Sequence, residues 1–176
     1  MTTSLVLTFM GRDQPGLANA IAQAITAAGG NWLESRVASL ADKFAGIVVV
    51  SVPEPNVADL SAALRSLDNV GLRITVELSR AAPLPAGYKI LELNLVAQDR
   101  PGIVRDVTQA LHQLGANIGA FSSDIESAPF TGETMFRATA RITVAEKITP
   151  EEVQITLEQL PDEIIVDFTA GADKPI

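Results

Sequence analysis

The chain contains one segment twice. The stretch GRDQPGLANAIAQAITAAGGN, which starts at residue 11, returns as AQDRPGIVRDVTQALHQLGAN from residue 97. Asp13 and Asp99, which lie 86 positions apart, open the motif, and a Pro-Gly pair and a later Asn keep the same spacing. The apolar positions of the intervening helix repeat as well, so both copies bury the same stripe. The chain is therefore expected to fold as one module used twice.

A proline- and glycine-containing stretch, RAAPLPAGY, separates the two periodic blocks. Such a stretch is typical of a linker. We therefore predict domain 1 at residues 1–80, a linker at 81–88, domain 2 at 89–170 and a C-terminal tail at 171–176. With 176 residues, of which 47% are hydrophobic, each half can bury a core but is marginal by itself.

Each half predicts the element order βαββαβ. In the first half the expected elements are a strand from 4 to 10 that stops at Gly11, a helix at 15–28 begun by Pro15, strands at 31–40 and 44–52, a helix capped by Asn56 and a strand at 72–78. In the second half they are a strand at 89–97, a helix at 101–114, strands at 117–126 and 134–144, a helix opened by a Thr149 capping box and a strand at 163–169. This order predicts the α+β fold class, with two ferredoxin-like domains whose antiparallel sheets carry both helices on one face.

The two halves differ in their hairpins and in the open faces of their sheets. Leu64 aligns with Leu157, 93 positions away, so the second copy gains about seven residues, expected at the 128–132 tip. Residues 47–50, IVVV, are apolar toward both faces of the first sheet. We expect the other domain, a second chain or a partner to cover that face.

Composition excludes several classes of function. A net charge of −8 opposes general nucleic-acid binding, which requires basic surfaces. The chain has no cysteine, which excludes disulfides, thiolate catalysis and Cys-ligated zinc. No run of apolar residues is long enough to span a membrane, and the first residues lack the basic start of a secretion signal. A soluble cytoplasmic protein without membrane contact is expected.

The repeated Asp-x-Pro-Gly lies where a strand passes into a helix. Glycine, expected at the second helical position, lets a ligand approach the unpaired N–H groups of the first turn, which favour anions. Asn31 and Asn117 begin the next strand, which we expect beside the strand that feeds the loop. An amide donates and accepts hydrogen bonds, so it suits a ligand with both a carboxylate and an ammonium group, such as a small amino acid. The alternative interpretation is that these residues only begin and end a helix.

The βαββαβ module, with Asp-x-Pro-Gly-Leu/Ile at its first helix and Gly-Gly-Asn or Gly-Ala-Asn before its second strand, resembles an ACT domain. The resemblance covers residues 3–79 and 89–169. Two such domains in tandem are similar to the glycine cleavage system transcriptional repressor family. Carried over residue by residue, the ligand-binding positions of the family fall on Asp13, Gln14, Pro15, Gly16, Asn31, Asp99, Arg100, Pro101, Gly102 and Asn117.

The resemblance implies a non-catalytic regulator that senses an amino acid at an interface between paired domains. The expected ligand is a small amino acid such as glycine or serine, with no cofactor, no metal and no catalytic residue. Because the chain lacks a helix-turn-helix, it would regulate transcription indirectly, through a protein partner such as a transcription factor, and as a homodimer if the paired domains come from two chains. The second copy is the expected occupied site, because Arg100 adds a positive charge where the first copy has Gln14.

Other candidate residues predict little chemistry. His112 is the only histidine, so neither a Ser-His-Asp triad nor a multi-histidine metal site can form, and a surface role is expected. Asp124 and Glu126 alternate along one strand without a neighbouring base. Trp32 is expected in the core or in an interface.

Two alternatives remain open from the sequence. One is a small α/β enzyme or an enzyme-regulatory subunit that uses the open sheet or the cleft between the domains, with Asp99, Arg100, Arg137 and Arg141 as its polar groups. The other alternative is a structural interaction module whose amino-acid site has decayed.

Overall fold

The computed structural model divides the chain into two compact units, Met1–Ala81 and Ala82–Ile176. It describes residues 1–80, 83–127, 132–161 and 163–169. The start of the predicted linker (81–82), most of the hairpin tip (128–131) and the tail (171–176) lie outside these described residues. The last predicted linker residue, Tyr88, already belongs to a strand.

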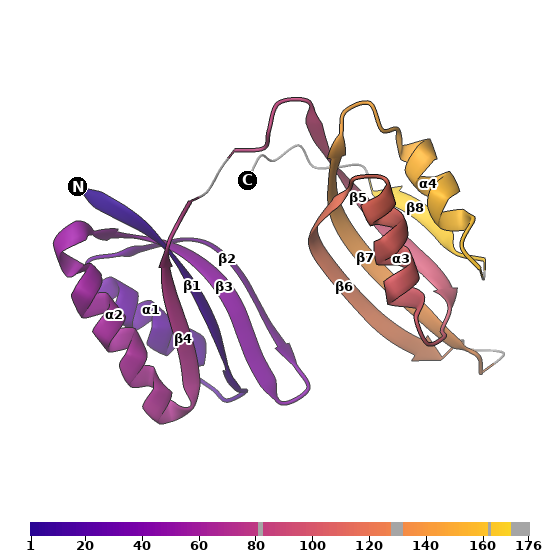
Figure 1. Cartoon of the computed structure of the whole chain (residues 1–176). Coiled ribbons are helices and arrows are strands. Elements are labelled where there is room, and N and C mark those ends of the chain that lie inside the picture. The colour runs from indigo at the N-terminus through magenta and orange to yellow at the C-terminus, as the bar shows by residue number, and fades with distance from the viewer. Residues whose placement is uncertain (81–82, 128–131, 162, 170–176) are drawn as a thin grey trace. The chain divides into compact units, whose positions relative to one another are not determined.

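The first unit has the predicted order (Figure 1). Its elements are β1 (Thr2–Arg12), α1 (Leu17–Ala27), β2 (Asn31–Leu40), β3 (Lys43–Pro53), the short 3-10 helix η1 (Glu54–Asn56), α2 (Val57–Ser66), η2 (Leu67–Val70) and β4 (Leu72–Leu78). The strands form one antiparallel sheet in the order β2-β3-β1-β4. Both helices pack against one face of it.

The second unit repeats this arrangement. Its elements are β5 (Tyr88–Gln98), α3 (Ile103–Gln113), β6 (Asn117–Ser127), β7 (Thr134–Ala145), α4 (Pro150–Glu158) and β8 (Ile165–Thr169). The antiparallel sheet has the equivalent order β6-β7-β5-β8. The predicted α+β class with two ferredoxin-like domains is confirmed.

Each unit has a core of its own residues. In the first unit, buried and more exposed side chains alternate along β1 and β3. Leu7 and Val50 are among the buried ones and belong to the same core as Ile21 of α1. In the second unit the corresponding cluster contains Leu93 and Leu111. The amphipathic pattern of the sequence therefore determined which face of each helix and sheet is buried.

Three local predictions were wrong in detail. The predicted end of the first strand at Gly11 is too early, because β1 continues to Arg12. A Cβ at Gly11 would lie 2.6 Å from the carbonyl oxygen of Gly71, so glycine allows close packing there.

Asn56 does not cap α2 through its side chain. Instead its Nδ2 donates a hydrogen bond of 2.9 Å to the carbonyl oxygen of Ala28, at the end of α1. The last strand begins at Ile165, two residues later than predicted.

The capping box of α4 is confirmed. The Thr149 hydroxyl accepts a hydrogen bond from the backbone N–H of Glu152 at 3.2 Å, and the Thr149 N–H donates to the Glu152 carboxylate at 2.7 Å. Two N–H groups that the helix itself cannot satisfy are thereby paired.

The sheet faces opposite the helices differ between the units. In the first unit Met10 and Ile47 lie on that face and are 58% and 52% exposed. In the second unit the equivalent face of β7 presents Arg137 and Thr139. The prediction that a neighbour covers the apolar face of the first unit remains a prediction.

Candidate functional site

Each repeated loop ends in a glycine with left-handed backbone. Gly16 precedes α1 with φ 92°, and Gly102 precedes α3 with φ 89°. The helices begin one residue later, so the predicted starts at Pro15 and Pro101 and the predicted glycine at the second helical position are wrong. Both positions require glycine, because a positive φ strains residues that carry a side chain. The loop still presents the first N–H groups of the helix, because these have no partner within the helix itself.

In the second copy, charged side chains surround the start of α3. Arg100 Nη2 lies 2.8 Å from Asp106 Oδ2, and Arg105 Nη2 lies 2.8 Å from Asp106 Oδ1. The Asp106 side chain, in the first turn of the helix, is only 16% exposed. Hydrogen bonds from Arg105 and then Arg100 hold the pKa of Asp106 below its usual range. The charge of Arg100, which we expected to attract a ligand, already compensates Asp106.

The first copy has no such cluster. Asn19 and Ala20 occupy the positions that correspond to Arg105 and Asp106, and the first turn of α1 contains no acidic residue. Gln14 donates from Nε2 to the carbonyl oxygen of Val70 at 2.8 Å, which ties the loop to η2. Of the two candidate anion sites, only the start of α1 therefore lacks an acidic side chain in its first turn.

The structure separates each asparagine from the loop of its own unit. Asn31 pairs with Ser51, which pairs with Ser4 near the start of β1, whereas Arg12, just before the loop, pairs with Lys43. The eight residue-to-residue steps from Ser4 to Arg12 span roughly 26 Å of strand. The expectation that the strand carrying Asn31 lies beside β1 is wrong, because β3 lies between β2 and β1.

The second unit has the same separation. Asn117 pairs with Thr143, whereas Gln98, just before the loop, pairs with Met135 at the other end of β7. The motif residues of one unit therefore do not gather into one site. Any site that uses both groups must combine two units.

The remaining candidates are dispersed. His112 is exposed on α3, and Trp32 is half-buried against the core of the first unit. Among the described residues, no cluster of three or more histidine and acidic side chains could hold a metal ion. None of the helices in this described part is long and apolar enough to cross a membrane.

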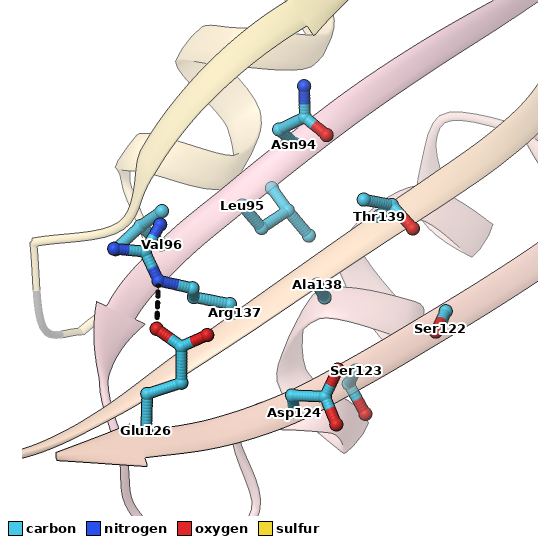
Figure 2. Close-up of a pocket in the computed structure, with 10 residues that line it drawn as sticks. All are labelled: Asn94, Leu95, Val96, Ser122, Ser123, Asp124, Glu126, Arg137, Ala138 and Thr139. Carbon is cyan, nitrogen blue, oxygen red and sulfur yellow. Dashed lines mark ion pairs between the residues drawn. The ribbon is translucent and has the colours of Figure 1, made fainter.

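A shallow depression of ≈ 230 Å³ lies on the sheet of the second unit (Figure 2). The sequence singled out Asp124 together with Glu126, and Arg137 separately; all three line this depression. Sequence reasoning missed Asn94, Ser122 and Thr139, which also line it. For Asn94 and Thr139, alternation with buried residues along β5 and β7 was the available signal, but the register that places them beside Ser122 of β6 is not readable from the sequence.

The comparisons with known proteins come from a family model and from solved structures. The family model of the ACT domain matches residues 3–77. This match covers most of the first unit. The second unit repeats its topology and its loop motif, so the chain consists of two ACT-type folds in tandem. A search of curated proteins gave no match.

Two solved structures match nearly the whole chain. A protein of unknown function from Galdieria sulphuraria is 27% identical, with a TM-score of 0.79, and the match covers 97% of this chain and 100% of that one. A proposed glycine cleavage system transcriptional repressor is 22% identical, with a TM-score of 0.69, and the match covers 96% of this chain and 98% of that one. The second likeness shows a shared tandem fold.

Proposed function

We propose that this protein is a non-catalytic regulator that binds a small amino acid, such as glycine or serine, and acts on transcription through a protein partner. The observation that carries the proposal is the doubled loop, in which Gly16 and Gly102 expose a helix start in each ACT-type unit. The tandem fold shared with a proposed transcriptional repressor supports the regulatory assignment.

The ligand site combines two units. The carboxylate of the amino acid accepts hydrogen bonds from the N–H groups at the start of α1 or α3. Asn31 or Asn117 of a second copy of the chain pairs with the remaining polar groups of the ligand. The uncompensated start of α1 favours the first copy over the second, because Asp106 already provides an anion at the start of α3.

Isothermal calorimetry with glycine and with serine tests this site. Asn31→Ala and Asn117→Ala are expected to weaken binding by about 1–3 kcal/mol, since each leaves a ligand group unpaired. Asn69 is an exposed asparagine of η2, so Asn69→Ala is the matched control and should bind glycine and serine like the wild type. If both candidate variants also bind like the wild type, the repeated motif is scaffolding and the proposed site is wrong.

Activity of the isolated chain as an enzyme has little support in the geometry. The four residues of that alternative are distributed between the loop after β5 and the face of β7, and Arg100 is paired with Asp106. Arg141 Nε lies 3.8 Å from Glu92 Oε1. These arrangements favour structural roles for the arginines.

A further inference from the structure

Short polar side chains form a row across the open face of the second unit. The strand register places Asn94 of β5 opposite Thr139 of β7, and Thr139 opposite Ser122 of β6. Longer side chains flank this row, including the Glu126–Arg137 pair on one side (Figure 2). The depression exists because short side chains lie between long ones. We call this row, together with Asp124, the trough.

The charges around the trough leave one carboxylate unbalanced. Arg137 Nε lies 2.8 Å from Glu126 Oε2, although the residue directly opposite Arg137 in the register is Asp124. Asp124 forms no ion pair within the described part of the chain, and it is exposed. The lining therefore carries one negative charge in excess.

The trough also offers neutral oxygen atoms. Asn94 uses its Nδ2 to donate to Thr169 Oγ1 at 2.9 Å, which leaves its carboxamide oxygen as an acceptor. The hydroxyls of Ser122 and Thr139 can accept as well. A carboxylate with several neutral acceptors suits a cation that donates several hydrogen bonds.

The first unit shows that the fold does not require these polar groups. By the strand pairing and the repeat, Asp124 and Glu126 correspond to Ala38 and Leu40, and Arg137 and Thr139 correspond to Ala45 and Ile47. All four equivalents are apolar. Asn94 and Ser122 correspond to Thr8 and Arg36, which are polar as well. The two units therefore differ on this face at the positions of Asp124, Glu126, Arg137 and Thr139, and only the second unit carries a carboxylate there.

We propose that the trough binds a small molecule through a primary ammonium group, which donates hydrogen bonds to the Asp124 carboxylate and to the Thr139 and Ser122 hydroxyls. This site lies on the face opposite the helices and is separate from the loops of the proposed regulatory site. The ammonium group can belong to a simple amine or to an amino acid. An amino acid would also place its carboxylate on Arg137, in exchange for Glu126.

An NMR titration of the full ¹⁵N-labelled chain tests the proposal, with ethanolamine and serine as probes at low ionic strength. Binding is expected with a Kd on the order of 1 mM, since the trough is shallow and exposed. The amide signals of Ser122, Asp124 and Thr139 should shift with both probes. Absence of saturable shifts at these amides with either probe would overturn the proposal.

Paired variants isolate the carboxylate. Asp124→Asn keeps the shape of the side chain and should weaken ethanolamine binding by about tenfold or more. Asp167→Asn is the control. Asp167 lies on β8, on the same face of the sheet as the trough, so the variant removes the same charge from that face, but Asp167 does not line the trough. Equal weakening in both variants would mean that only the overall charge attracts the probe, and the site would be disproved.

Arg137→Gln distinguishes the two sources of the ammonium group. If the trough is built for an amino acid, this variant weakens serine binding and leaves ethanolamine binding unchanged or stronger. If it is built for an amine, serine and ethanolamine bind the variant alike. Asn31→Ala and Asn117→Ala separate this site from the proposed regulatory site, because they should leave the shifts at Ser122 and Thr139 intact even if the regulatory site fails.

Discussion

At the scale of single residues, backbone conformation explains why both copies of the loop have glycine immediately before the helix. Gly16 and Gly102 have φ near +90°, and nothing lies within 4 Å of a Cβ built on Gly16. Space for a side chain is therefore available there, and the obstacle is torsional. A large substitution at Gly16 would perturb the helix start before it obstructed a ligand.

Gly16→Ala is expected to lower the free energy of unfolding by about 1–2 kcal/mol, because alanine is strained in the left-handed region. Gly16→Asn should lose less, since asparagine tolerates that region. Urea unfolding followed by circular dichroism measures both. A Gly16→Ala variant as stable as the wild type would show that the loop relaxes to another conformation.

At the scale of elements, the two copies of the strand–loop–helix start have diverged in charge. Arg100 and Arg105 both pair with Asp106 at the start of α3, where the negative side chain also complements the helix dipole. The start of α1 has no such pairing in its first turn. The same backbone arrangement therefore supports a helix start with paired charges at α3 and a helix start without such charges at α1.

The Asp106 cluster predicts a pH dependence of stability. Its carboxyl pKa is lowered in the folded state, so its ionised form stabilises the fold above the unfolded pKa near 4, and this contribution is lost as the pH falls through the lowered value. Asp106→Asn should therefore be less stable than wild type at pH 7, and the difference should shrink below about pH 4. Urea midpoints between neutral and acidic pH measure the difference, with Asp68→Asn as control. A difference that does not depend on pH would contradict the electrostatic explanation.

At the scale of the whole molecule, two separate cores support two ACT-type units. Leu7 is fully buried in the first core, and its replacement by alanine should cost that unit about 2–5 kcal/mol. Hydrogen exchange should then accelerate throughout the first sheet and remain unchanged for Leu93 and its neighbours in the second. Equal acceleration in both units would show that they unfold as one.

The net charge of −8 also acts at this scale. Repulsion from phosphates predicts that the purified protein alone does not retard DNA at physiological salt. An electrophoretic mobility assay on the promoter that controls its own gene measures this directly. Retardation by the isolated protein would replace the proposed indirect regulation with direct binding.

Much of the fold was readable from the sequence. The strand Leu72–Leu78 has the predicted bounds, and the capping box at Thr149 forms as predicted. These features are local: alternation, helical periodicity and capping act over a few residues. The repeat added the long-range information that two such modules occur.

The tertiary structure decided how distant residues combine. Only strand order and register show that Asn31 lies far from the loop of its own unit, and only register brings Asn94, Ser122 and Thr139 into one row. Only side-chain placement shows that Arg100 is paired with Asp106 and that Asn56 contacts the end of α1. The physical reason is that a sequence pattern records which face a residue occupies, whereas a site depends on which strands and loops become neighbours when those faces pack.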